Sequence, residues 1–183
     1  MATVAAPQGT AGAHTTVFTP GLARSAKVST LVGSPVNFAT NTLEIAVPPG
    51  NPAKIATFAD LARPGVKTVV CAPAVPCGAA TVAIEAATGV KLTPVSEENA
   101  VTDVLGKVSS AEADAGLVYV TDVKGAGSRV TGIPFPQSDK AVNTYPIATI
   151  AASKNSKVAK AFVDYVTGTV GRAVLAAAGF GAP

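Results

Sequence analysis

The sequence predicts an α/β fold in which short apolar strands alternate with helices. β-Branched and apolar runs at residues 66–71 and 115–120 are typical of buried strands, and glycine or proline flanks the first of them. Between these runs, residues 101–108 place valine and leucine at the spacing of an amphipathic helix. Strands that alternate with helices in this way are expected to form an open sheet with crossover connections.

The composition is that of a globular protein. Of 183 residues, 48% are hydrophobic and 14% are charged, which is enough apolar material for one sizeable core or two small lobes. No apolar run approaches the roughly 20 residues of a membrane span. The net charge of +3 is spread out, and no basic cluster is interleaved with aromatic residues, which argues against a nucleic-acid partner.

The first half of the chain becomes regular only from Asn41. Residues 1–27 are rich in Ala, Gly, Thr and Pro, and only residues 15–19 suggest a strand there. A strand is expected at 42–47, before Pro48-Pro49-Gly50. A capped helical turn follows at 57–62, with Thr57 as its N-cap and Asp60 at its third position.

The central stretch consists of a strand, a rigid loop and a helix. The strand at 66–71 is followed by Pro73 and Pro76, which stop it and stiffen the loop. Gly78 then opens an alanine-rich helix that ends at Gly89.

The rest of the chain continues the alternation. An extended piece at 92–95 precedes the helix whose stripe is Val101, Val104, Leu105 and Val108; Ser96 and Asn99 are its N-cap candidates, with Glu97 and Glu98 at its positive end. The later elements expected are a strand at 115–120, a short helix from Thr121 that breaks at 125–127, strands near 130–135 and 145–151, and a helical region at 156–178 interrupted near Gly168.

The loop after the central strand is a candidate anion site. The unpaired N–H groups of Cys77, Gly78 and Ala79 lie at the positive end of the helix dipole. Ligands of open α/β sheets gather at the carboxyl ends of the strands. Three strand ends bring Cys77, Val101 and Tyr119 there, although an ordinary strand-to-helix turn explains the same pattern.

The two cysteines, Cys71 and Cys77, flank this loop. Two cysteines make a poor zinc site, since zinc needs four ligands and the histidine, His14, is far away in the sequence. The spacing of the cysteines also differs from the C-x-x-C motif of redox enzymes. A local disulfide would stiffen the loop and imply an oxidising, extracytoplasmic compartment; two independent core cysteines are the alternative. No signal peptide is recognisable in the first 30 residues.

No catalytic constellation is recognisable, so an enzyme is not expected. G-x-S-x-G, P-loop, G-x-G-x-x-G and H-E-x-x-H motifs are all missing from the sequence. A thiol redox enzyme that uses Cys71 and Cys77 is one hypothesis, and it is weaker than the two binding functions given below. It would require one of these cysteines to have a lowered pKa, so that its thiolate is present at neutral pH.

Several segments together resemble the molybdate-binding protein of ABC importers, a bilobed extracytoplasmic solute-binding protein with the type II periplasmic-binding fold. The resemblance covers the chain from about Leu31 to its C-terminus. It rests on NFATNTLEIAVPPGNP (37–52), FADLARPG (58–65), VPCGAAT (75–81), VSEENAVTDVLGKVSSAEADAGLVYVTD (95–122), NTYPIATI (143–150) and AGFGAP (178–183).

The resemblance implies a site for molybdate or tungstate made of neutral donors. In that family an unhydrated dianion is held by serine hydroxyls and N–H groups of the first lobe, and by backbone N–H groups and a tyrosine hydroxyl of the second. The second-lobe pattern falls on Cys77, Val101 and Tyr119, and no residue is expected to ligate a metal cation directly. The implied partner is the membrane permease of an ABC importer, and no further cofactor is implied.

The first lobe departs from the family pattern, because both serine loops are missing. The expected organisation is therefore a remnant of lobe I at 1–45, a complete lobe II at 46–146 and a segment at 147–183 that returns to lobe I, with strands near 42–47 and 145–150 as the hinge. The alternative function is an interaction module with weak or no oxyanion binding, which forms a homo-oligomer through the shortened lobe.

Overall fold

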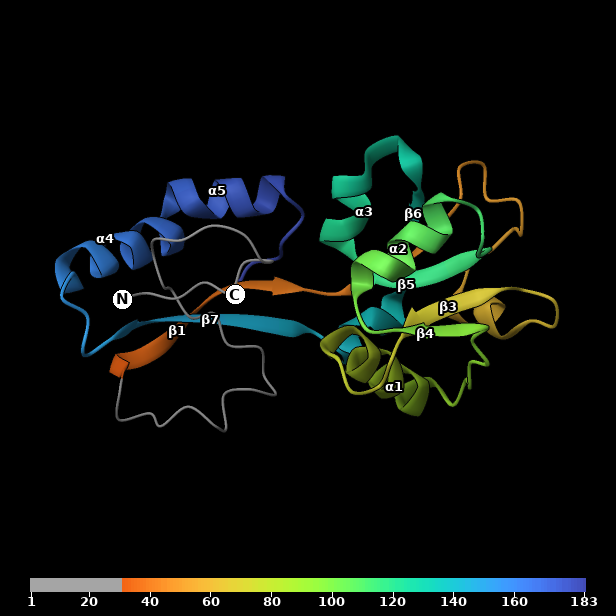
Figure 1. The fold of residues 1–183 in the computed structure, drawn as a ribbon, viewed down its shortest axis with the longest axis horizontal. Coiled ribbons are helices and arrows are strands. Elements are labelled where there is room, and N and C mark those ends of the chain that lie inside the picture. Colours follow the sequence, from red (N-terminus) through yellow and green to blue (C-terminus); the bar gives the residue numbers. More distant parts are fainter. Residues whose placement is uncertain (1–30) are drawn as a thin grey trace. The chain divides into compact units, whose positions relative to one another are not determined.

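The computed structural model describes residues 31–183, with side chains from Ser34 onward (Figure 1). The described residues divide into two compact units: unit 1 contains residues 31–40 and Asn143–Pro183, and unit 2 is Asn41–Val142. The sequence analysis placed these boundaries at 46 and 146. The strand expected at 15–19 and His14 lie outside the described residues.

Unit 2 is built on an open sheet with crossover connections, as expected, and the sheet is mixed. Within the described residues it has five strands in the order β4-β3-β5-β2-β6. β3 pairs in parallel with β4 and β5, whereas β2 is antiparallel to β5 and β6. The strands are β2 (Leu43–Val47), β3 (Thr68–Cys71), β4 (Ser96–Glu98), β5 (Ala115–Tyr119) and β6 (Thr131–Ile133).

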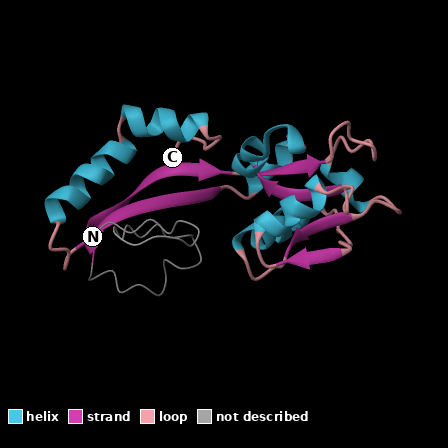
Figure 2. Cartoon of the chain, turned by 45° about the horizontal axis from the view of Figure 1, so that its top comes forward, coloured by secondary structure: helices cyan, strands magenta, loops and turns pink. Residues whose placement is uncertain are grey.

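Helices cover both faces of this sheet. The chain crosses from β3 to β4 through α1 (Pro76–Thr88) and from β4 back past β3 to β5 through α2 (Val101–Ser109). Right-handed crossovers in opposite directions place their helices on opposite faces. Accordingly, α1 lies on one face, and α2 and α3 (Val120–Ala126) lie on the other (Figure 1). Figure 2 shows the same layers by element type.

The core of unit 2 lies between the sheet and these helices. A methyl group at Gly116 would lie 2.7 Å from Val104 Cγ1, so this position of β5 faces α2. Because side chains alternate along a strand, Leu117 and Tyr119 face the opposite side, toward α1. Within this core the rings of Phe58 and Phe135 stack, with their centroids 5.5 Å apart.

Short 3₁₀ helices complete unit 2: η2 (Phe58–Ala62), η3 (Gly127–Arg129) and η4 (Pro136–Lys140). η2 confirms the predicted capped turn. The Asp60 carboxylate accepts the N–H groups of Ala56 and Thr57 at 2.9 and 2.8 Å. These backbone donors lower the pKa of Asp60, that of Ala56 most.

Unit 1 contains β1 (Leu31–Asn41), β7 (Asn143–Ile150), α4 (Ser156–Thr167) and α5 (Thr169–Ala177). Within the described residues, β1 and β7 form a two-stranded sheet. Tyr145 meets Phe38 and Phe180 edge to face, at centroid distances of 6.4 and 5.6 Å. Thr40 and Gly181 exchange backbone hydrogen bonds of 3.0 and 2.9 Å, which tie the end of the chain to β1.

Most predicted elements are confirmed, including the helix end at Gly89, where φ is 72°, and the interruption at Gly168 between α4 and α5. Two helix starts were wrong, and one strand was missed. α1 begins at Pro76, not at Gly78, because proline fits the first helical position, where no N–H is needed.

The other errors concern β4 and β1. Residues 96–98 form a parallel strand beside β3, so the N-cap of α2 is Ala100 and not Ser96 or Asn99. The extended piece expected at 92–95 lies just before this strand. β1 was not predicted, since its sequence LVGSPVNFATN does not alternate clearly between apolar and polar residues.

Candidate functional site

The structure brings the predicted donor residues to one edge of the unit 2 sheet. β3, β4 and β5 are parallel and adjacent, so their carboxyl ends lie together. Cys77 follows β3 at the start of α1, Val101 follows β4 at the start of α2, and Tyr119 is the last residue of β5.

At this edge the chain leaves two adjacent parallel strands toward opposite faces of the sheet. The chain leaves β3 toward α1 on one face of the sheet, and it leaves β5 toward α3 on the other face (Figure 1). In open α/β sheets, ligands usually bind at the carboxyl edge where loops diverge from adjacent parallel strands. Cys77 follows one of these two strands, and Tyr119 ends the other.

The start of α1 presents two backbone donors. Pro76 has no N–H, and the Ala79 N–H donates to the Val75 carbonyl at 2.9 Å, so the expectation that Ala79 is unpaired was wrong. Within residues 31–183 the N–H groups of Cys77 and Gly78 have no hydrogen-bond acceptor. They lie at the positive end of a helix of 13 residues, where an anion is favoured.

Gly78 lies directly against the loop that precedes α1. A Cβ atom there would lie 1.9 Å from the Ala72 carbonyl oxygen and 2.6 Å from that of Cys71. The loop is held by the Ala72 N–H, which donates to the Glu98 carbonyl at 2.8 Å, and by the Val75 N–H, which donates to the Ala72 carbonyl at 3.1 Å. Only glycine allows this close approach of helix and loop.

A disulfide joins Cys71 to Cys77 across the same loop, with their Cα atoms 5.6 Å apart. Both residues are buried, with exposed fractions of 1% and 5%. The Cys77 side chain is therefore part of the core, while its N–H lies at the helix start.

The start of α2 offers a second pair of donors. The N–H groups of Asp103 and Val104 donate to the Ala100 carbonyl at 3.1 and 3.5 Å. The N–H groups of Val101 and Thr102, the first two residues of α2, are therefore the ones that can bind a ligand. Val101 packs partly against the core and so fixes the position of this helix start. The Thr102 amide was not predicted, because the helix start was assigned to earlier residues.

The backbone N–H of Tyr119 is already paired. It donates to Asp122 Oδ2 at 2.9 Å, so a contact of this residue with a ligand has to come from its side chain. The residue is 9% exposed, and its position on β5 directs the ring to the α1 side of the sheet. Burial raises the pKa of Asp122.

The sequence analysis missed Asn41 and Thr121. Asn41 Nδ2 donates to Thr121 Oγ1 at 2.8 Å, and the pairing of Leu43 with Tyr119 places Asn41 beside the carboxyl end of β5. A hydroxyl that accepts one hydrogen bond can still donate its own proton. Only the strand register reveals this pair, because the residues are 80 positions apart.

The segments that carry the proposed donors contain no charged side chain, and Glu98, Asp103 and Asp122 flank them in the sequence. Residues 71–79, 99–102 and 117–121 include no Lys, Arg, His, Asp or Glu. Across residues 31–183 no group of three His, Cys, Asp or Glu side chains could hold a metal ion. The donors are backbone N–H groups and hydroxyls, which suit an anion rather than a cation.

None of the helices found between residues 31 and 183 combines the length and the hydrophobicity that a membrane span requires.

Comparisons with known proteins agree with this architecture. The molybdate-binding protein ModA of Mycobacterium tuberculosis is 49% identical over 182 residues, which cover 97% of this chain and 70% of the relative. A substrate-binding domain from Clostridium difficile, assigned to a molybdenum ABC transporter, has a TM-score of 0.69 at 22% identity and covers 89% of this chain and 72% of its own. The periplasmic molybdate-binding protein of Azotobacter vinelandii has a TM-score of 0.63 at 21% identity, over 85% of this chain and 71% of its own.

The predicted α/β, periplasmic-binding type of fold is therefore confirmed. The family model described as bacterial extracellular solute-binding protein matches residues 2–181, nearly the whole chain. Together with the ModA likeness, this match shows that the chain belongs to the bacterial extracellular solute-binding proteins.

Proposed function

We propose that this protein binds molybdate or tungstate at the carboxyl edge of the unit 2 sheet and delivers it to the membrane permease of an ABC importer. The observation that carries the proposal is the convergence of Cys77, Val101 and Tyr119 on three adjacent strand ends. The 49% identity to ModA supports the choice of oxyanion. The proposed location is outside the cytoplasm, in the periplasm or at the cell envelope.

The donors proposed for the anion are uncharged. They are the N–H groups of Cys77, Gly78 and Val101 and the hydroxyl of Tyr119, and the dipoles of α1 and α2 add positive potential at their starts. A site made of donors favours a fully ionised dianion such as molybdate. Phosphate carries a proton at neutral pH and needs an acceptor, so it is disfavoured.

The proposed role is binding and release, with no chemical step. A hydrogen bond to a charged group contributes about 1.5–3 kcal/mol net, so each correctly placed donor changes affinity roughly 10- to 150-fold. Donors on a rigid sheet edge lose little freedom when the ligand binds, which preserves that contribution.

Isothermal titration with molybdate, tungstate, sulfate and phosphate tests this function. We expect saturable binding of molybdate and tungstate, weaker binding of sulfate and none of phosphate. An equal response to all four anions, or no response to any, would contradict the proposal.

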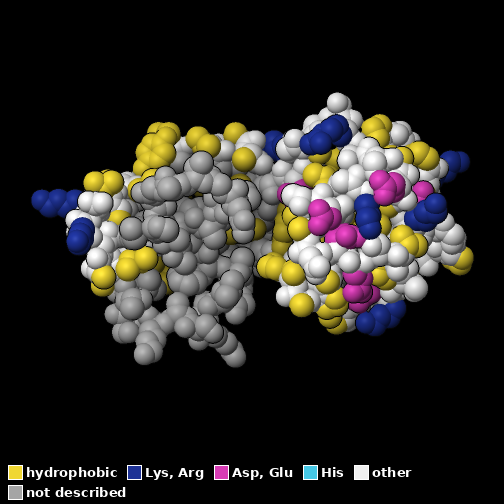
Figure 3. Space-filling model, viewed as in Figure 1, with side chains coloured by type: hydrophobic (Ala, Val, Ile, Leu, Met, Phe, Trp, Pro, Cys, Tyr) yellow, Lys and Arg dark blue, Asp and Glu magenta, His cyan; other side chains and the backbone are white. Residues whose placement is uncertain are grey.

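A second candidate function is self-association, and it is favoured by the surface of unit 1. The apolar side chains of Val158, Tyr165 and Val174, on α4 and α5, are 70%, 56% and 61% exposed. In Figure 3 hydrophobic side chains show over these helices, with Lys and Arg side chains at the left end of the same unit. Exposed apolar patches of this kind mark interaction surfaces.

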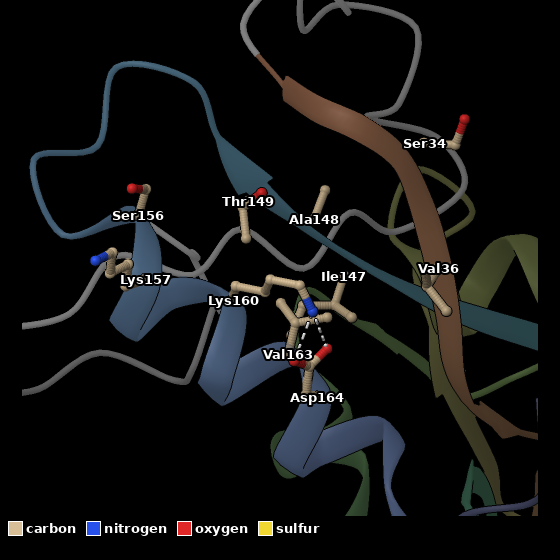
Figure 4. A pocket seen from close by; sticks show the side chains of 10 residues that line it. All are labelled: Ser34, Val36, Ile147, Ala148, Thr149, Ser156, Lys157, Lys160, Val163 and Asp164. Carbon is tan, nitrogen blue, oxygen red and sulfur yellow. Dashed lines mark hydrogen bonds and ion pairs between the residues drawn. The ribbon is translucent and has the colours of Figure 1, made fainter.

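A groove of about 390 Å³ lies in the same unit, between β7, β1 and α4 (Figure 4). Its walls include Val36, Ile147 and Val163, and Lys160 pairs with Asp164 at 2.6 Å beside them. We propose a second copy of this chain as the occupant. Light scattering over a range of concentrations would show a dimer that dissociates on dilution, and a monomer at every concentration would exclude it.

A further inference from the structure

The disulfide spans a loop that few backbone hydrogen bonds hold. Residues 72–76 connect β3 to α1; the N–H groups of Ala72 and Val75 donate backbone hydrogen bonds, and the Val75 carbonyl accepts the N–H of Ala79. Pro73 and Pro76 have no N–H to contribute. The covalent link from Cys71 to Cys77 is therefore the strongest constraint on the first turn of α1.

We propose that Cys71 is a positioning residue for oxyanion binding: through its disulfide it fixes the direction of the Cys77 and Gly78 N–H groups. This inference rests on the proposed function. Cys71 is anchored at the end of β3, which pairs with both β4 and β5. The disulfide thus ties the amides at the start of α1 to β4, which precedes Val101, and to β5, which ends at Tyr119.

The rest of α1 does not depend on this link. Ala80, Thr81 and Ile84 are buried against the sheet, and the Thr81 hydroxyl donates to the Cys77 carbonyl at 3.0 Å. Opening the disulfide is therefore expected to leave the helix in place and to loosen only its first turn. The donors at this turn must then be ordered by the ligand, which costs affinity.

A fixed donor geometry also determines which anion fits. Preorganised donors are aimed at oxygen positions at one distance, so they distinguish a larger tetrahedral anion from a smaller one. A loosened turn can adjust to either anion. Loss of the disulfide is therefore expected to lower the affinity for molybdate more than the affinity for sulfate.

The test compares oxidised wild-type protein with the double variant Cys71→Ala and Cys77→Ala, which keeps every backbone N–H. Titration calorimetry well below the melting temperature gives the Kd for molybdate and for sulfate. We expect the molybdate Kd to rise about tenfold, as for the loss of one net hydrogen bond. The ratio of the sulfate Kd to the molybdate Kd is expected to fall toward one. The helical circular dichroism signal is expected to stay unchanged.

Ile55→Val is the matched control, because Ile55 is a buried core residue outside the loop. It is expected to lower the melting temperature and to leave both Kd values unchanged. Wild-type protein treated with a phosphine reductant provides a second readout if the double variant does not fold, and it should reproduce the weakened molybdate binding.

Unchanged Kd values and an unchanged ratio after loss of the disulfide would overturn the inference about Cys71 but leave the proposed function standing. This holds whatever happens to the melting temperature. If the wild-type protein binds none of the oxyanions, the proposed function itself fails, and the inference fails with it.

Discussion

An alanine at position 78 would have no room for its methyl group. The Cβ atom would lie 1.9 Å from the Ala72 carbonyl oxygen, whereas ordinary contacts begin at 3.4 Å. The neighbouring atoms are backbone and cannot rotate away. Gly78→Ala therefore forces the loop and the first turn of α1 apart by about 1.5 Å, the difference between these distances.

The expected cost follows from this overlap. Overpacking of a closely packed site typically costs about 1–3 kcal/mol, and a backbone clash of this size belongs at the upper end. For a chain of 183 residues, about 3 kcal/mol corresponds to a fall of roughly 6–12 °C in melting temperature. Molybdate affinity should also fall at least about tenfold, because the Cys77 and Gly78 donors move.

Gly106→Ala is the matched control. Gly106 lies inside α2, and nothing lies within 4 Å of the position that its Cβ would take. Alanine is preferred to glycine in a helix by about 0.5–1 kcal/mol, so this variant should melt slightly higher than the wild type. Calorimetric melting and molybdate titration on both variants give the comparison.

Equal melting temperatures for the Gly78 and Gly106 variants would refute the packing described for the start of α1. If the Gly78→Ala variant is destabilised but binds molybdate as tightly as the wild type, the close packing at Gly78 does not contribute to the binding site.

Further predictions concern one hydroxyl and two carboxylates. Tyr119→Phe should weaken molybdate binding about 10- to 100-fold with little change in melting, whereas Tyr165→Phe, on the exposed surface of α4, should change neither. Burial raises the pKa of Glu44, so its ionised form opposes folding; Glu44→Gln should raise stability at pH 7, by an amount that shrinks as the pH falls and vanishes below the unfolded pKa near 4.5. Asp60→Asn should have the opposite sign, since backbone donors lower the pKa of Asp60: it should destabilise at pH 7, and the difference should disappear only in acid below pH 3.8. Urea unfolding as a function of pH checks both, and a pH-independent difference for either variant would contradict the assignment.

Local chemistry explains why much of the fold was predictable. Gly89 and Gly168 end helices in the structure as their sequence context indicated, and the valine stripe of α2 packs on the core. β4 was missed because Ser96-Glu97-Glu98 has no strand pattern. It pairs with β3, and Lys107 of α2 binds both Ser96 and Glu98. Such a strand is specified by tertiary contacts, which a local pattern does not contain.

The candidate site was predictable only at the level of topology. Parallel strands and their helix starts were enough to bring Cys77, Val101 and Tyr119 to one edge. The sequence did not predict which N–H groups are available, because that depends on the first residue of the helix. Since α1 begins at Pro76, the Ala79 N–H is hydrogen-bonded to the Val75 carbonyl, whereas the Gly78 N–H has no backbone acceptor among the described residues. The contact of Asn41 with Thr121 follows from strand register.

The central claim is that uncharged donors at the starts of α1 and α2 bind the oxyanion. Titration of ¹⁵N-labelled protein with molybdate, followed by amide NMR, tests it most directly. The account predicts saturable shifts of the Cys77, Gly78 and Val101 amide signals. Saturable binding that leaves these signals in place, or that shifts only those of Lys157 and Lys160 in unit 1, would contradict it.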